Sequence, residues 1–281
     1  MRTLVLSAVL VVASLGEALA WDQVGHSIVA EIAQWRLSPD ASAAVAQVLG
    51  AGHSLASVAS WADDAREERP ETYNWHFVDI PIDRGDYQPS VDCRDSDKGD
   101  CVVAELDRLK NEVPCASDDK KSEALRFAVH FVGDIHQPLH TVLEEKGGNL
   151  IQVDLFTHGL ICTGTCRPSH VHTNFHAAWD TGLIEKTVWN WGADVDRLET
   201  GWLQSAEASA SGIDGGEPAD WAVETHRAAQ TIWNLLPSDG VLDDNYFQQV
   251  LPVLDRQLGV AGLRLARFLN EAYGSNQCPT R

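Results

Sequence analysis

Residues 130–140 read HFVGDIHQPLH and place three histidines and one aspartate within eleven residues of otherwise apolar sequence. On a helix, His130 and Asp134 lie one turn apart on one face, close enough to bind one cation together. Pro138 ends or kinks such a helix, so His140 can point toward a neighbouring position. Taken alone, the segment also suits a core helix with hydrogen-bonded histidines. The rest of the chain favours metal ligands.

The first twenty residues have the features of a signal peptide. Arg2 gives a positive start, residues 4–15 are apolar, and Ala18-Leu19-Ala20 forms a small-x-small cleavage site. We expect residues 1–20 to be removed, leaving a mature chain that begins at Trp21 and is secreted or periplasmic. The apolar stretch is too short for a membrane span, and no later run of about twenty apolar residues occurs. No membrane anchor is therefore expected.

Composition limits the class of protein further. No linker, repeat or low-complexity tract divides residues 21–281, so one catalytic domain is expected. The net charge of −20 argues against binding of nucleic acid through a basic surface. An acidic protein can still bind phosphate where metal ions supply the positive charge locally.

The six cysteines are an even set, which in an exported protein predicts up to three disulfides. Cys162 and Cys166 flank a short turn and are expected to pair with each other. The other four allow three pairings that the sequence does not rank: Cys93, Cys101, Cys115 and Cys278.

Apolar residues recur at helical spacing along much of the chain, which predicts a mainly α fold. The expected helices cover residues 24–35, 41–49, 122–134, 219–236 and 246–273. Residues 74–81 and 149–156 are expected to form short strands or extended loops that line a site. Most tryptophans are expected in the core or between helices, among them Trp35, Trp189, Trp191 and Trp233.

Further candidate ligands occur in four short clusters: WDQVGH at residues 21–26, SWAD at 60–63, WHFVD at 75–79 and NFHAAWD at 174–180. His176 and Asp180 repeat the one-turn spacing of His130 and Asp134. Together the clusters provide five histidines and three aspartates, which exceeds one tetrahedral zinc site and fits a multinuclear one. These are His26, His76, His130, His140, His176, Asp63, Asp134 and Asp180.

In this order the clusters resemble those of the zinc-dependent single-strand nucleases of the S1 and P1 type, relatives of the bacterial zinc phospholipases C. The resemblance covers nearly all of the mature chain. It rests on an N-terminal Trp with His five residues later, followed by WAD, WHF, HFxGDxHQPLH, GGN and NFHxxWD. The ordered set is much more specific than any one motif.

The resemblance implies three zinc ions and assigns ligands to each. The first would be held by Asp63, His76, His130 and Asp134, the second by the amino nitrogen and carbonyl oxygen of Trp21 with His26 and the bridging Asp134, and the third by His140, His176 and Asp180. Asp63 and Asp134 would also orient the nucleophile, a hydroxide that bridges two zinc ions.

The resemblance also assigns substrate contacts. Arg66 would stabilise charge in the transition state, and Phe77, Asp79 and Asn149 would stack on and hydrogen-bond a nucleobase. Each has an alternative, since Arg66 lies in a charged stretch, Asp79 could pair locally, and Asn149 suits a turn. His136 is expected to pack or to support a ligand. The other histidines are expected at surface or structural positions: His53, His158, His170, His172 and His226.

The predicted function is hydrolysis of single-stranded DNA and RNA to 5′-phosphate products, with 3′-nucleotidase activity and no protein partner, so a monomer is expected. The nearest alternative is a zinc phospholipase C. The five-residue step from Trp21 to His26 and the final ligand Asp180, where those enzymes use Glu, argue against it. A non-catalytic zinc-binding protein is a third hypothesis, but such proteins tend to have repetitive histidine tracts.

Overall fold

The computed structural model describes residues 21–157, 170–188 and 190–274. Several predictions fall outside the described residues, namely the signal peptide at residues 1–20, the pairing of Cys162 with Cys166, and the positions of His158, Trp189 and Cys278.

The mainly α fold is confirmed, and all five predicted helices are present. They are α1 (Gln23–Gln34), α2 (Pro39–Leu49), α6 (Asp118–Asp134), α10 (Pro218–Leu235) and α11 (Asp244–Gly274). α6 begins four residues earlier than predicted, with Asp118 and Asp119 in its first turn, where acidic side chains favour the positive end of the helix dipole. α2 begins as its sequence indicates, because the Ser38 side chain accepts a hydrogen bond from Ala41 N.

Shorter helices complete the described chain: α3 (Trp61–Glu68), α4 (Pro89–Asp92), α5 (Val102–Cys115), α7 (Phe175–Ala177), α8 (Leu183–Glu185) and α9 (Trp191–Thr200). Between them lie the 3₁₀ turns η1 (Ala56–Val58), η2 (Pro70–His76), η3 (Pro138–Thr141), η4 (Glu144–Lys146) and η6 (Trp202–Gln204), and the π-helical turn η5 (Ala178–Gly182). Of the predicted extended segments, 149–156 contains a strand, whereas 74–76 belong to η2 and only the residues after His76 are extended.

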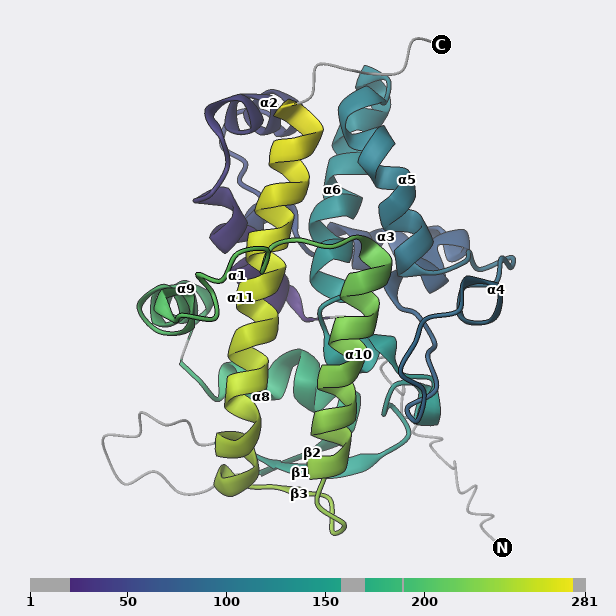
Figure 1. Cartoon of the computed structure of the whole chain (residues 1–281), viewed down its shortest axis with the longest axis vertical. Coiled ribbons are helices and arrows are strands. Elements are labelled where there is room, and N and C mark those ends of the chain that lie inside the picture. Colours follow the sequence, from purple (N-terminus) through teal and green to yellow (C-terminus); the bar gives the residue numbers. More distant parts are fainter. Residues whose placement is uncertain (1–20, 158–169, 189, 275–281) are drawn as a thin grey trace, which may run out of the picture.

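The sheet is small and has the order β2-β1-β3. β1 (Gln152–Phe156) is antiparallel to β2 (His170–Asn174), with Gln152 opposite Asn174, and parallel to β3 (Val241–Leu242). It lies at the end of the molecule where α10 ends and α11 begins (Figure 1). β2 leads directly into α7 and η5, so the sheet fixes the start of the segment that carries His176 and Asp180.

The helices pack around a continuous apolar core. Figure 1 shows α11 along the length of the molecule, with α6 and α10 beside it. α1 approaches α11 so closely that a Cβ atom on Gly262 would lie 2.4 Å from Ile32 Cγ2. Only glycine permits this approach. On another face of α1, His26 meets His130 of α6, with 3.8 Å between the centroids of their stacked rings.

The prediction for the tryptophans is wrong at two positions. Trp35 is 54% exposed and Trp191 is 38% exposed, whereas Trp233 is half-buried against the core. Trp35 satisfies its indole N–H by donating to Glu31 one turn earlier, so it needs no partner from the core.

The structure selects one cysteine pairing, a disulfide between Cys93 and Cys101, and Cys115 is also disulfide-bonded. No helix in the described part of the chain is long and apolar enough to cross a membrane.

Candidate metal centre

Asp134, at the end of α6, lies at the centre of the predicted ligands. Its Oδ2 is 3.0 Å from His76 Nδ1 and 3.1 Å from His130 Nε2. Its Oδ1 faces another direction, 3.4 Å from His26 Nε2 on α1. Asp63, on α3, is 3.7 Å from His76 Nδ1 and 3.6 Å from His130 Nε2 through its Oδ1. The two oxygens of Asp134 therefore lie near different histidines, as a bridging carboxylate requires. The first two predicted sets adjoin each other, because His26 also groups with Asp63 and His130.

A third set lies close by. His140, His176 and Asp180 are buried and offer ligand atoms that all lie within 4.8 Å of one another. His176 Nε2 is 3.5 Å from Asp180 Oδ2, and His140 Nδ1 is 3.8 Å from Asp134 Oδ1. Asp180 lies in the π-helical turn η5, and such turns occur often at functional sites. The spacing of His176 and Asp180 thus brings them together as predicted.

Backbone carbonyls orient the histidine rings. The Nδ1 atom of His130 donates to Ala59 O, that of His140 donates to His76 O, and that of His176 donates to Gly147 O, each at 2.7 Å. This fixes the proton on Nδ1 and leaves Nε2 of these rings as the free ligand atom. Gly147 adopts φ +64, and a Cβ atom there would lie 2.5 Å from Leu139 O, so glycine is required where its carbonyl reaches His176.

Trp21, where the described part of the chain begins, packs into the same region. Trp21 is fully buried, and a Cβ atom on Gly25 would lie 2.9 Å from Trp21 Cβ. Asp22 caps α1 by accepting from Val24 N and Gly25 N, and its own N–H donates to Asp180 O at 3.2 Å. Trp21 and Asp22 therefore lie beside two of the ligand sets.

Several atoms of these ligands are buried without a hydrogen-bond partner in the described structure: His26 Nε2, His76 Nε2, His140 Nε2, Asp63 Oδ1 and Asp134 Oδ1. Such atoms are rare in folded proteins because each costs free energy. Imidazole nitrogens and carboxylate oxygens are the ligands that zinc prefers outside thiolate sites. The residues present therefore fit zinc.

The electrostatics agree with a cation at this position. Burial lowers the pKa of four ligand histidines: His26, His76, His140 (to about 3) and His176 (to about 4). These four rings are therefore neutral near pH 7. Burial opposes ionisation of Asp134, but the positive charge of His130 and the close approach of the His130, His26 and His76 rings hold its pKa well below the usual value. Neutral histidine and ionised aspartate are the forms that bind metal.

Two groups hold a proton that a cation would displace. Burial favours a neutral His130, but Asp134 and Asp63 outweigh it and raise its pKa to about 9. Burial raises the pKa of Asp180 well above its usual value. Metal binding should therefore release protons from this site.

Phe77 and Asp79 share a cavity of about 230 Å³ beside the metal centre, lined also by Asn74, Asp92 and Leu143. Burial raises the pKa of Asp79 to about 6, helped by the charges of Asp92 and Glu144. An aromatic face and a carboxyl group at one cavity are the elements needed to stack on a base and hydrogen-bond its edge.

The remaining predicted contacts lie nearby. Arg66 is half-buried, and its positive charge acts on His176. Asn149 is not in the lining of the cavity; its side chain donates to Lys146 O at 2.8 Å, which matches the alternative role in its turn. His226 is structural, since it is buried and its Nδ1 donates to Thr141 O.

Gln137 is a residue that we did not predict. It is buried, its Nε2 donates to Asp180 Oδ1, and its Oε1 accepts from Leu139 N. It therefore orients a ligand of the third set. The signal was its position between His136 and Pro138 in the ligand-rich segment.

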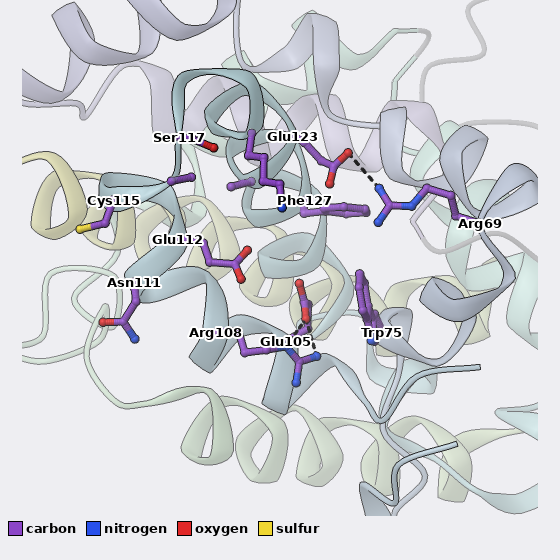
Figure 2. Close-up of a pocket in the computed structure, with 13 residues that line it drawn as sticks. Arg69, Trp75, Glu105, Arg108, Asn111, Glu112, Cys115, Ser117, Glu123 and Phe127 are labelled. Atoms are coloured by element: carbon purple, nitrogen blue, oxygen red, sulfur yellow. Dashed lines mark hydrogen bonds and ion pairs between the residues drawn. The ribbon is translucent and has the colours of Figure 1, made fainter. Parts of the chain in front are cut away.

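A larger cavity, of about 460 Å³, lies between α5 and α6 and contains none of the predicted ligands (Figure 2). Ion pairs cross its wall, from Arg69 to Glu123 and from Arg108 to Glu105. Phe127, in the same wall, stacks on Phe131, which packs edge-on against His76. This cavity lies behind the metal centre, and its charges are largely compensated.

Comparison with known proteins identifies relatives along the whole described length. The S1/P1 Nuclease family model matches residues 21–274. Endonuclease 2 of Arabidopsis thaliana is 31% identical, over 90% of this chain and 91% of the relative. Nuclease P1 of Penicillium citrinum is 29% identical, over 91% of this chain and 98% of the relative. Nuclease S1 of Aspergillus oryzae is 29% identical, over 89% of this chain and 91% of the relative.

Proposed function

The chain belongs to the S1/P1 nuclease family, a family of phosphodiester hydrolases, and we propose that it cleaves single-stranded DNA and RNA to 5′-phosphate products with three bound zinc ions. We further propose that it removes the phosphate of 3′-nucleotides. The observation that supports this best is the arrangement of buried, partly unpartnered histidines and aspartates around Asp134.

The proposal assigns zinc to the three predicted ligand sets, with Asp134 shared by two of them. Bound zinc would supply a Lewis acid for the phosphate and lower the pKa of a coordinated water. The protein contributes fixed geometry, since carbonyls and Gln137 hold the rings and Asp180 in place. Arg66 would place its guanidinium against the phosphate oxygens, where negative charge increases in the transition state.

Single-strand preference would follow from the cavity beside the metal centre. A base must leave its stack to lie on Phe77 and meet Asp79, and a paired base pays more free energy to do so. Stacking on an aromatic ring tolerates every base, so little sequence specificity is expected. In the proposal Asn149 joins these contacts once its turn hydrogen bond is exchanged for the substrate.

We propose that the protein acts outside the cytoplasm, as a single-domain monomer formed by residues 21–281 after removal of residues 1–20. The Cys93–Cys101 disulfide supports this location, because such bonds persist in oxidising compartments.

The test uses the mature protein beginning at Trp21, loaded with zinc, with labelled single-stranded DNA and RNA, matched duplexes and a 3′-nucleotide. We expect cleavage of both single strands to 5′-phosphate ends, slower cleavage of duplexes, and about three zinc ions per chain by elemental analysis. A chelator should stop the reaction and added zinc should restore it. Intact nucleic acid with release of phosphorylated head groups from phospholipid vesicles would support a phospholipase C instead.

A further inference from the structure

Tyr73, on η2, lies next to Phe77, the aromatic residue of the 230 Å³ cavity beside the metal centre. Its ring packs edge-on against Phe77, with 5.9 Å between centroids and 84° between planes. Two cations lie over the Tyr73 ring: Arg66 Cζ is 5.3 Å and Lys98 Nζ is 4.6 Å from its centroid. The ring is half-buried and Lys98 is exposed, so a base can reach the ring face by displacing the flexible Lys98 side chain.

The loop that carries Lys98 is held in place against η2. The Cys93–Cys101 disulfide closes it, Asn74 N donates to Lys98 O at 2.8 Å, and Asn74 Nδ2 donates to Gly99 O at 3.0 Å. Gly99 has φ +89, and a Cβ atom there would lie 2.5 Å from Trp75 Nε1. The position of Lys98 beside Tyr73 is therefore fixed by the backbone of the loop and not by its side chain alone.

Two arginines near this place bind carboxylates, in the pairs Arg69–Glu123 and Arg108–Asp100. Arg94, which lines the Phe77 cavity, instead donates to Ser90 O and forms no ion pair with a described residue. Within residues 21–157, 170–188 and 190–274, neither Arg66 nor Lys98 forms an ion pair. Asp95 and Asp97 share the loop with Lys98 but lie outside ion-pair distance of it. In a protein of net charge −20, two uncompensated cations over one ring form a local site for an anion.

We propose that Tyr73 and Lys98, together with Arg66, form a second nucleotide subsite, which binds the base and phosphate of the nucleotide next to the one in the Phe77 cavity. The inference rests on the proposed nuclease function and extends it to longer substrates. Cations that track the backbone and rings that stack on successive bases are the features by which proteins bind single strands.

The dimensions suit consecutive nucleotides. Successive phosphates of one strand lie about 3.4 Å apart along the axis of B-DNA, and an unstacked strand is more extended. Rings 5.9 Å apart are therefore within one nucleotide step of each other. Because Lys98 and Arg66 both lie beside the Tyr73 ring, the phosphate of a base bound there would be within reach of both cations.

The test compares kcat/KM for a tetranucleotide with kcat/KM for a 3′-mononucleotide. In Lys98→Gln and in Tyr73→Leu we expect the ratio of these constants to fall about tenfold, the loss typical of one stacked base or one desolvated phosphate contact. Lys98→Gln should also reduce the salt dependence of oligonucleotide KM by about 0.7 in logarithmic slope, the value for one phosphate of a single strand. The conservative single variants Tyr73→Phe and Lys98→Arg should keep the parental ratio of the two kcat/KM values.

Lys120→Gln is the matched control, because Lys120 is exposed and lies in the lining of the cavity between α5 and α6. It removes the same charge and should leave the ratio unchanged. If all variants cleave nucleic acid with the parental ratio, the subsite is wrong while the nuclease function stands. If the parent cleaves no nucleic acid, the proposed function itself is wrong. Lys98 is exposed, so its variant tests the subsite even if Tyr73→Leu fails to fold.

Discussion

Two buried polar regions lie on either side of the end of α6, and they differ in whether the protein satisfies them. In the metal centre, nitrogen and oxygen atoms of five ligands have no hydrogen-bond partner among the described residues. Around His136 almost every buried nitrogen and oxygen atom has a hydrogen-bond partner. His136 Nδ1 donates to Val132 O at 2.7 Å, Arg264 Nη1 donates to His136 Nε2 at 3.0 Å, and Gln257 Nε2 donates to His136 O at 2.8 Å.

The His136 network ends in ion pairs: Arg264 binds Glu224 at 2.6 Å, and Arg256 binds the same carboxylate at 2.6 Å. Only Nε of Arg264 lacks a partner within this network. The comparison shows that burial of a histidine does not reveal its role. A satisfied polar group stabilises the fold, whereas a cluster of unsatisfied ones, each costing about 1–3 kcal/mol, indicates a ligand-binding site.

The sharpest test of this difference is Asp134→Asn. An amide keeps the shape but removes the charge that faces both ligand sets, so we expect loss of bound zinc and at least about a thousandfold lower kcat, the scale of a preorganised charge at a reacting centre. Elemental analysis and steady-state kinetics measure both. Asp154→Asn, at a partly exposed carboxylate paired with His172, is the control and should keep full zinc and activity. Near-normal turnover in Asp134→Asn would remove the bridging role.

The opposite result is expected on the other side of α6. Arg264→Leu leaves Glu224 and His136 without their main partner, and breaking a buried pair costs about 3–5 kcal/mol. We expect a much lower urea midpoint, with zinc content and activity per folded molecule unchanged. Arg227→Leu, at an exposed position on α10, should leave the free energy of unfolding within about 0.5 kcal/mol of the parent value. A loss of zinc in Arg264→Leu at equal stability would show that the two regions are one.

A third experiment concerns the start of the chain. If the amino group of Trp21 is a ligand, a residue or tag fused before it should remove one zinc ion per chain and lower activity about a hundredfold, on the scale of one lost electrostatic group. A tag at the C-terminus is the control. Full activity with methionine placed before Trp21 would show that the amino group does not bind metal. Its burial beside Asp180 is the structural reason for the prediction.

The sequence alone predicted the satisfied and unsatisfied regions unequally. Helix boundaries followed from periodicity and caps, and the one-turn spacings of His130 with Asp134 and His176 with Asp180 are side-chain contacts in the fold. The partners of His136 were not predictable, because Arg264 lies 128 residues later on a helix whose packing angle no local pattern encodes. The exposure of Trp35 was missed for the same reason, since the helical pattern does not show where the core ends.

The cavity beside the metal centre gives an intermediate case, a single carboxyl group that no cation of the described chain pairs with. Burial raises the pKa of Asp79 to about 6, with contributions from Asp92 and Glu144. Between the unfolded value near 3.8 and 6, the folded state binds more protons than the unfolded state, so stability falls as pH rises through this window. Above pH 6 the penalty is complete and on the order of 3 kcal/mol.

Asp79→Asn removes the charge, so its free energy of unfolding in urea should exceed that of the parent by about 2–3 kcal/mol at pH 8 and match that of the parent at pH 4. Asp83→Asn, at an exposed neighbour, should match the parent at both pH values. Equal stability of Asp79→Asn and the parent at pH 8 would mean that the carboxylate is already stabilised by the protein. The gain at pH 8 would instead show that this site, like the metal centre, reserves a polar group for a ligand at the expense of the fold.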